Sequence, residues 1–347
     1  MKTIFFCGHK SRYGLAHLSL FLRSKLSVTL VVLATDKRWN LFHESLTGES
    51  NHTSKNFKLI NSIREGTLRK LILRIKYGRN NFKTIIKNLK EFQVPYLLCD
   101  DTNSPEFIKK IRDLQPDLIL SAAYPQIFSR ELITIPQKGA INCHPSLLPK
   151  FRGAHPHYWT IVKGESESGL TAHIMTERLD DGDIVSQIRF PVENFYYDQL
   201  YERIIQESPR LVQDIEDYFL NGGKKLIKQD STKATYFRND RAIHHRIFWE
   251  INSDKDIYNL IRGGNAFCFF RCQKVIIIKA EIAINNRNLT NGIQVPPGII
   301  IDIHSDYLAI KSKEGCINAR EFIINSMKFN PTSFQKKYRL QIGERFE

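Results

Sequence analysis

Residues 139–153, GAINCHPSLLPKFRG, decide the fold of this chain. The stretch begins as a short apolar run, carries the polar pair Asn142 and His144 at its end, and then turns between prolines. A short apolar run of this kind predicts a buried strand of an α/β sheet, and such sheets bind ligands beyond the carboxyl ends of their strands. Asn142 and His144 are therefore candidates for a functional site at a strand end.

On both sides of this stretch, apolar runs alternate with segments of helical spacing. The run DLILSAAY at residues 117–124 predicts a neighbouring strand, and the helix before it begins with Ser104 and Pro105. Alternating strands and helices predict a wound, mostly parallel, Rossmann-like α/β sheet. The other expected strands are at 3–7, 28–34, 94–99, 169–175 and 186–192, and a long helix is expected at 196–221.

The pattern changes near residue 240, where short alternating strands separated by turn residues begin. With a helix at 254–262, this pattern predicts a small β-barrel of OB-like type. We therefore expect a domain that carries the site over residues 1–205, a linker helix and connection over 206–240, and a C-terminal barrel-like domain over 241–347.

Composition sets bounds on the cellular setting. The hydrophobic fraction of 42% is enough for a packed core, and no apolar run approaches the roughly 20 residues of a membrane-spanning helix. The six cysteines are scattered, and Cys268 and Cys272 have no second Cys or His pair at ligand spacing. We expect reduced thiols, no zinc site and a cytoplasmic protein.

Much of the net charge of +15 is concentrated in one segment. Residues 51–90 carry eleven Lys and Arg side chains against a single acidic one, Glu65. One interpretation is the solvated face of amphipathic helices in a Lys- and Asn-rich chain. The other is a basic insertion whose surface binds an anion, such as a nucleotide diphosphate, an RNA or a membrane.

A carboxylate-rich turn, LDDGDI at residues 179–184, follows the strand expected at 169–175. If that strand lies beside the one that ends at His144, Asp180 faces the imidazole, raises its pKa and can relay a proton. Asn142 can donate an amide N–H to a developing oxyanion. Each feature alone is more often structural, but their combination in this order is specific.

Four segments together resemble the family of formyltransferases that use N10-formyltetrahydrofolate. They are DLILSAAYPQIF (117–128), GAINCHPSLLPKFRGAHP (139–156), GESESGLTAHIM (164–175) and LDDGDI (179–184). The resemblance places the family's catalytic residues on Asn142, His144 and Asp180. The last hundred residues also resemble the family's carboxy-terminal barrel.

The resemblance implies that a formyl group passes from the folate to a primary amine without a metal ion. In that reaction Asn142 and protonated His144 hold the tetrahedral oxyanion, and Asp180 fixes His144 and helps to move a proton from the amine to the departing N10. The resemblance also implies that the folate contacts the segment after 117–122, the SLLP turn and the LDDGD turn. The expected folate-binding residues are Ala122, Ala123, Tyr124, Ser146, Leu147, Leu148, Pro149, Leu179, Asp181, Gly182 and Asp183.

The sequence leaves two candidates for the amine that accepts the formyl group. The segment RGAHPHYW at 152–159 is similar to the amino-sugar enzymes of the family and suits the stacking of a sugar or base, although it could equally begin a core helix. It favours a nucleotide-linked amino sugar, with Arg152, Gly153, His155, Tyr158 and Trp159 as the expected substrate-binding residues.

The basic segment 51–90, the barrel and the net charge instead favour methionyl-tRNA as the acceptor. A third possibility is a relative that binds RNA or a protein partner without catalysis. A homodimer is left open.

Overall fold

The computed structural model describes residues 1–8, 11–34, 79–223, 225–238, 245–264, 266–283 and 295–347. The chain forms two compact units. The first comprises Met1–Arg152, Gly169–Arg189 and Arg203–Tyr236, and the second comprises Gly153–Ser168, Phe190–Glu202 and Phe237–Glu347. The domain boundaries expected at residues 205 and 240 stay a prediction.

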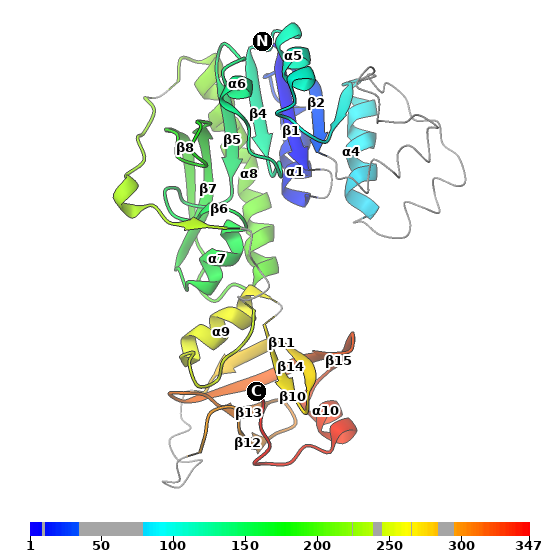
Figure 1. The fold of residues 1–347 in the computed structure, drawn as a ribbon, viewed down its shortest axis with the longest axis vertical. Coiled ribbons are helices and arrows are strands. Elements are labelled where there is room, and N and C mark those ends of the chain that lie inside the picture. Colours follow the sequence, from blue (N-terminus) through cyan, green and yellow to red (C-terminus); the bar gives the residue numbers. More distant parts are fainter. Residues whose placement is uncertain (9–10, 35–78, 224, 239–244, 265, 284–294) are drawn as a thin grey trace, which may run out of the picture. The chain divides into compact units, whose positions relative to one another are not determined.

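A seven-stranded sheet forms the centre of the first unit (Figure 1). Strands β1 to β5 pair in parallel, and β7 runs antiparallel to β5. The mostly parallel α/β sheet predicted from the sequence is confirmed. In the spatial order β3-β2-β1-β4-β5-β7-β8, the strands are Tyr96–Cys99, Val28–Ala34, Thr3–Gly8, Leu118–Ala122, Ala140–His144, Glu167–Ile174 and Ile184–Pro191.

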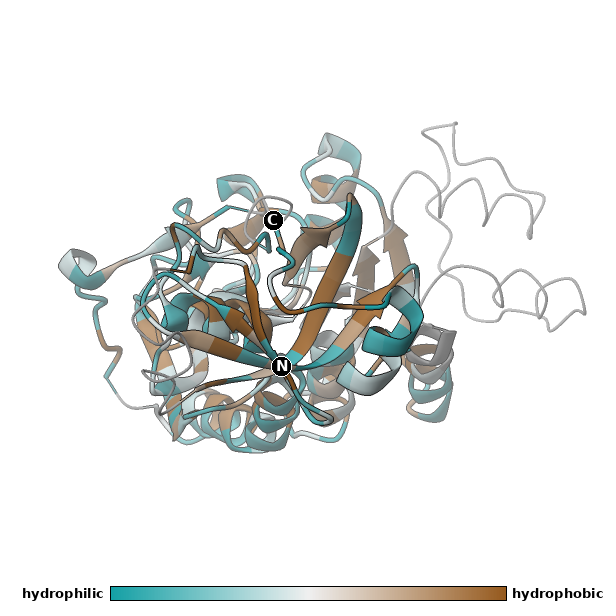
Figure 2. Ribbon diagram, turned by 90° about the horizontal axis from the view of Figure 1, so that it is seen from below, coloured by the Kyte–Doolittle hydropathy of each residue, from teal (hydrophilic) through white to brown (hydrophobic). Residues whose placement is uncertain are grey.

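Alternate side chains of β1 pack against helices on opposite faces of the sheet. The ring of Phe5 lies 5.5 Å from that of Phe21 in α1 (Arg12–Phe21), and the ring of Phe6 lies 6.3 Å from that of Phe107 in α5 (Pro105–Asp113). The short helix α6 (Arg130–Ile133) packs beside α5. Because both faces are covered, the strands are apolar along most of their length, as the brown ribbons in Figure 2 show.

Helix α4 (Arg79–Glu91) is the part of the basic segment that the structure describes, and it packs on α1. Its buried Ile85 and Leu89 lie four residues apart, as the expected amphipathic spacing requires. Residues 51–78, with most of the segment's basic side chains, lie outside the described residues. The long helix expected at 196–221 is α8 (Tyr197–Leu220), which is followed by the short η1 (Ser231–Lys233) and β9 (Tyr236–Phe237).

An antiparallel half-barrel dominates the second unit. The helix expected at 254–262 is α9 (Asp254–Gly263), and it begins with a capping box in which Ser253 and Asp256 bond each other's backbone N–H. The predicted barrel-like tail is confirmed as this open sheet. Its elements are β10 (Phe267–Phe270), β11 (Gln273–Ile282), β12 (Ile300–Ile303), β13 (Leu308–Lys311), β14 (Cys316–Ile324), β15 (Met327–Phe329) and α10 (Pro331–Tyr338).

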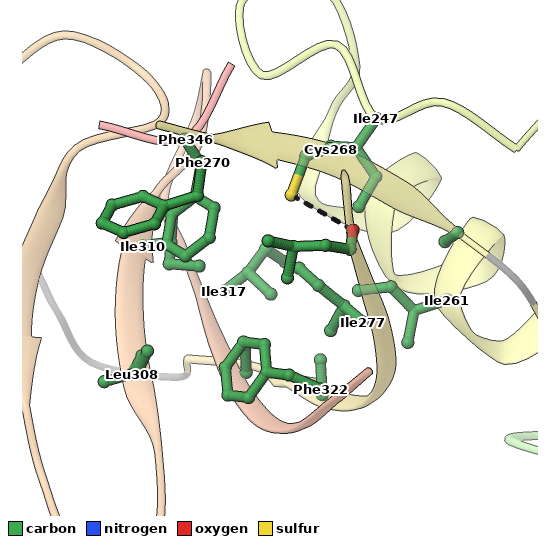
Figure 3. Close-up of a cluster of buried hydrophobic side chains, with 14 of the residues drawn as sticks. Ile247, Ile261, Cys268, Phe270, Ile277, Leu308, Ile310, Ile317, Phe322 and Phe346 are labelled. Carbon is green, nitrogen blue, oxygen red and sulfur yellow. Dashed lines mark hydrogen bonds between the residues drawn. The ribbon is translucent and has the colours of Figure 1, made fainter. Parts of the chain in front are cut away.

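The core of the second unit lies between this sheet and its helices, and Figure 3 shows part of it. Phe322 of β14 and Ile277 of β11 are fully buried there, and Ile261 of α9 joins them. The thiol of Cys268 donates to the carbonyl oxygen of Val275 at 3.9 Å, which is a weak contact inside an apolar cluster. The thiol therefore behaves as an apolar core group rather than a metal ligand.

No helix in the described ranges is long and apolar enough to cross a membrane. The same ranges contain no group of three His, Cys, Asp or Glu side chains that could hold a metal ion.

Candidate active site

Strand β5, an interior strand of the sheet, carries both polar candidates near its carboxyl end. Asn142 and His144 lie two residues apart, so their side chains share one face of the strand. On one side, β5 pairs with β4 in parallel, and on the other it pairs with β7 antiparallel, with His173 of β7 opposite Asn142. This register brings a third polar side chain, His173, beside the first two.

The carboxylate of Asp180 lies among these three side chains. Its Oδ1 is 3.3 Å from Asn142 Nδ2 and 3.4 Å from His173 Nε2. Its Oδ2 is 3.6 Å from His144 Nδ1. Asp180 and His144 are only 6% and 5% exposed, so the charges interact in a region of reduced dielectric constant. The structure therefore brings together the three residues expected to be catalytic.

Backbone carbonyls determine which nitrogen of each imidazole carries a proton. His144 Nε2 donates to the carbonyl of Phe151 at 2.9 Å, and His173 Nδ1 donates to that of Ile174 at 2.9 Å. A carbonyl oxygen can only accept, so these two nitrogens are protonated in either charge state. The remaining nitrogens, His144 Nδ1 and His173 Nε2, face the carboxylate of Asp180.

The side-chain nitrogen of Asn142 contacts two protein groups in this arrangement. Its Nδ2 donates to Asp180 Oδ1 and also lies 3.3 Å from His173 Nε2, which accepts when His173 is neutral. The reverse amide orientation would turn its oxygen toward a carboxylate, so the hydrogen-bond partners select this one. The N–H expected to meet an oxyanion is therefore directed at protein groups in the free protein.

Burial has the largest effect on the pKa of His144. Desolvation lowers the pKa of His144 below its ordinary value of 6.5, and the proximity of His173 lowers it further. Asp180 and the hydrogen bond to Phe151 raise it, as the sequence predicted for the carboxylate, but they do not outweigh burial. In the free protein burial therefore favours the neutral form of His144, and the protonated imidazole expected during the reaction stays a prediction.

The SLLP turn is tied to β7 through one hydroxyl. Thr171 Oγ1 donates to the carbonyl of Ser146 at 2.7 Å and accepts from the backbone N–H of Leu148 at 3.3 Å. Gln187 of β8 donates to the carbonyl of Leu148 at 2.9 Å. The peptide bond between Leu148 and Pro149 is cis. The turn that follows His144 is thus held rigidly against the strand opposite.

The other residues expected to bind folate lie in two further segments. Ala122 ends β4 beside Cys143 of β5, and Ala123 and Tyr124 follow it. Leu179, Asp181, Gly182 and Asp183 surround Asp180 in its turn. A Cβ at Gly182 would lie 1.9 Å from the carbonyl oxygen of Ile174, so only glycine fits there. Their binding of folate stays a prediction.

The residues expected to bind the acceptor divide between the two units. Arg152 is in the first unit, where Nη1 pairs with Asp181 Oδ1 at 2.5 Å. Gly153, His155, Tyr158 and Trp159 belong to the second unit, where α7 (Pro156–Val162) begins after His155.

The rings of Tyr158 and Trp159 are packed within the second unit. Trp159 stacks on Phe237 with ring centroids 4.3 Å apart, and Tyr158 contacts His245 at 4.8 Å. Tyr158 and Trp159 are 3% and 6% exposed, so almost no ring surface is left for a ligand. This packing matches the core-helix alternative for these two residues.

Two side chains at the site did not emerge from the sequence. His173 lies two residues after Thr171 in β7, so the two side chains share one face of the strand, and this spacing is the signal in the sequence that could have found it. Gln229 donates to the carbonyls of Asp180 and Gly182 at 2.9 and 2.7 Å, from a segment in which nothing in the sequence points to a site.

Comparison with known proteins identifies the family of this chain. Residues 79–214 match the sequence model of the formyl transferase family, and residues 242–339 match that of the formyl transferase C-terminal domain. A methionyl-tRNA formyltransferase of Clostridium tetani is 32% identical over 247 residues, which cover 70% of this chain and 76% of the relative.

Two solved structures share the fold. WlaRD, a sugar 3N-formyl transferase solved in the presence of dTDP and 5-N-formyl-THF, has a TM-score of 0.58 at 18% identity and covers 92% of this chain and 97% of its own. An N-formyltransferase of Helicobacter canadensis, in complex with folinic acid and dTDP-3-aminofucose, has a TM-score of 0.57 at 19% identity and covers 92% and 99%. Two family models and a relative of 32% identity match this chain, and Asn142, His144 and Asp180 converge in its structure. This chain therefore belongs to the formyltransferase family.

Proposed function

We propose that the site built around Asp180 transfers the formyl group of N10-formyltetrahydrofolate to a primary amine. The observation that carries this proposal is the convergence of Asn142, His144 and Asp180 in one buried cluster, with hydrogen-bond distances or close approaches of 3.3 to 3.6 Å. The cluster offers an amide donor, an imidazole and a carboxylate, which are the groups that acyl transfer between two nitrogens requires.

In this reaction the amine nitrogen attacks the formyl carbon, and the carbonyl electrons move to oxygen. The amide of Asn142 stabilises the oxyanion, and a donor of this kind contributes about 3 kcal/mol in comparable sites. His144 adds to this stabilisation once it has taken the proton of the amine. The two contacts of Asn142 at 3.3 Å are long, so little is lost when the amide turns toward the oxyanion. Hydrogen bonds of catalytic groups commonly tighten only when substrate is bound.

The proton balance is completed by Asp180 and His144. The attacking amine becomes cationic in the tetrahedral intermediate and gives up one proton to the pair. The carbon–N10 bond then breaks, and the folate nitrogen leaves with a proton from the same pair. Because burial favours neutral His144 in the free enzyme, the imidazole can accept the proton of the amine and then donate a proton to N10.

For the acceptor we favour the amino group of a nucleotide-linked amino sugar. The support is the segment GAHPHYW at 153–159, which is similar to that of amino-sugar enzymes in the family. His157 in this segment is only partly buried and bonds the hydroxyl of Tyr197 at 2.7 Å through Nε2. The buried rings of Tyr158 and Trp159 do not contribute to this argument.

Methionyl-tRNA is the second candidate acceptor, and a different observation favours it. The relative from Clostridium tetani, named for that substrate, is 32% identical over 76% of its length. A net charge of +15 also suits a polyanionic substrate.

A direct comparison of acceptors tests the proposal. The purified chain is incubated with N10-formyltetrahydrofolate and, separately, a panel of nucleotide-linked amino sugars and charged initiator methionyl-tRNA, and products are identified by mass spectrometry. With an amino sugar, we expect a product in which a formyl group replaces one hydrogen of the amine, with the corresponding increase in mass.

Formylation of methionyl-tRNA alone would move the assignment to the second candidate. Absence of transfer to every amine, together with RNA binding, would favour the non-catalytic alternative.

A further inference from the structure

We infer that Gln229 is a positioning residue that holds the Asp180 carboxylate against His144. This inference rests on the proposed function of the Asp180 site. Gln229 lies in the connection between α8 and η1, 49 residues from Asp180 in sequence. It belongs to the same compact unit as the site.

The side-chain amide of Gln229 bridges the turn that carries Asp180. Its Nε2 donates to the carbonyl of Asp180 at 2.9 Å and to the carbonyl of Gly182 at 2.7 Å. These two bonds use both of its N–H groups, and they hold the peptide planes that follow Asp180 and Gly182. The first of these planes adjoins the Cα of Asp180 and so helps to set the direction in which its side chain leaves the backbone.

The oxygen of the same amide is fixed from the other side. Oε1 accepts from Arg152 Nε at 3.2 Å and from Arg152 Nη2 at 2.8 Å. Arg152 Nη1 in turn pairs with Asp181 Oδ1 at 2.5 Å. The guanidinium of Arg152 therefore orients the amide of Gln229 and also pairs with Asp181 in the same turn. The side chains of Arg152 and Asp181 are only 12% and 20% exposed.

The turn needs such support because its backbone is strained. Asp180 has a φ of +53°, in the left-handed region that residues with side chains rarely adopt. Such conformations persist only where surrounding contacts determine them. Relaxation of Asp180 toward ordinary dihedral angles would redirect its carboxylate, whose contacts with His144, His173 and Asn142 range from 3.3 to 3.6 Å.

Two variants of Gln229 separate positioning from general stability. Gln229→Met keeps the length of the side chain and loses every hydrogen bond, whereas Gln229→Glu keeps an acceptor for Arg152 and loses both donors to the carbonyls. Gln213→Met is the matched control, because Gln213 is exposed on α8, away from the turn, and donates to Asp217 Oδ1 at 3.1 Å. Circular dichroism and thermal melting confirm that each variant is folded.

The first readout is the titration of His144, followed by NMR of the labelled histidine side chains and assigned with His144→Gln. The charged or titratable neighbours that face His144 are Asp180 and His173, and only Asp180 raises its pKa. We therefore expect the pKa of His144 to fall in both Gln229 variants and to stay unchanged in Gln213→Met.

The second readout is steady-state kinetics with the acceptor that the chain proves to use. We expect kcat to fall about tenfold or more in both Gln229 variants, with KM for the acceptor changed far less, because misplacement of a catalytic group by a fraction of an ångström acts on the chemical step. A folded Gln229→Glu with an unchanged pKa of His144 would overturn the inference, as would full kcat. If no amine is formylated, the proposed function fails, while the titration still decides the inference about Gln229.

Discussion

His144 has one ring nitrogen committed to a backbone carbonyl and the other turned to a carboxylate. The Nε2 proton is held by Phe151 at 2.9 Å, so the site can gain or lose a proton only on the side of Asp180. A proton taken up at Nδ1 faces Asp180 Oδ2, which lies 3.6 Å away. This arrangement suits a reaction in which the proton that leaves one nitrogen must reach another.

Removal of either member of this pair should abolish most of the turnover. In His144→Ala and Asp180→Asn we expect kcat/KM for formyl transfer to fall about 10²-fold or more, because each variant loses the proton carrier or the group that orients it. The measurement is the initial rate of tetrahydrofolate release with the established acceptor. Asp306→Asn, an exposed change in the second unit, is the control, and full activity in either site variant would show that the site is elsewhere.

His17 in α1 makes the stability of the first unit depend on pH. Its imidazole is buried, its Nδ1 donates to the carbonyl of Tyr13 at 3.1 Å, and its Nε2 has no hydrogen-bond partner among the described residues. Burial lowers the pKa of His17 from 6.5 to about 4. The unfolded chain therefore binds a proton near pH 6.5 that the folded protein takes up only near pH 4, so stability falls as pH decreases across this window.

The loss of unfolding free energy attributable to His17 should reach about 3 kcal/mol at the low-pH end of this window. His17→Leu should flatten the decrease in unfolding free energy between pH 6.5 and 4, measured by urea denaturation at several pH values. The exposed His304 supplies the control, since His304→Leu should leave the pH dependence as it is. Equal pH dependence in wild type and His17→Leu would contradict the assignment.

At the scale of elements, the pairing of β5 with β7 builds the site. The antiparallel register places His173 opposite Asn142 and Thr171 opposite His144. A shift of one residue would turn every side chain of β7 to the other face of the sheet, which would remove His173 from Asp180 and Thr171 from the SLLP turn. The register therefore matters more to the site than the length of either strand.

The turn after β7 should tolerate no side chain at Gly182. A Cβ there would lie 1.9 Å from a backbone oxygen, that of Ile174, which cannot move without displacing the strand. Gly182→Ala should therefore destabilise the protein by about 2 kcal/mol and reduce turnover of the remaining folded enzyme, because the turn that carries Asp180 must shift. Denaturant unfolding and kinetics on the folded fraction test both parts.

Gly222→Ala gives the matched comparison. Gly222 has a positive φ of +74°, and none of the described residues has an atom within 4 Å of its Cβ position. This substitution should cost about 1 kcal/mol of stability and leave kcat unchanged. A Gly182→Ala protein as active as Gly222→Ala would show that the turn adapts without consequence for Asp180.

At the scale of the whole molecule, charge acts on association more than on chemistry. The chain carries 51 basic and 36 acidic side chains, so it attracts polyanions whether or not one of them is its substrate. A nucleotide-linked sugar carries few charges, whereas tRNA releases many counterions when it binds. Salt dependence therefore distinguishes a specific RNA substrate from general attraction.

Binding of an unrelated RNA should be detectable at about 50 mM salt and weaken at least tenfold at about 200 mM. Fluorescence anisotropy with a labelled RNA measures this, and initiator tRNA is compared at the same salt concentrations. Equal weakening for both RNAs is expected if the acceptor is an amino sugar. A tRNA that stays bound at high salt would contradict that choice, and the lack of any RNA binding at low salt would contradict the role assigned to the net charge.

The sequence by itself determined the parallel sheet, the half-barrel and the three residues Asn142, His144 and Asp180. Hydrophobic periodicity specifies strands and helices locally, and the motifs that carry Asn142, His144 and Asp180 can be recognised by their order in the sequence. Only the tertiary structure decided that Tyr158 and Trp159 are core residues, that burial outweighs Asp180 in setting the pKa of His144, and that Gln229 supports the turn. These outcomes depend on solvent exposure and on contacts between segments 49 residues apart, which no local pattern encodes.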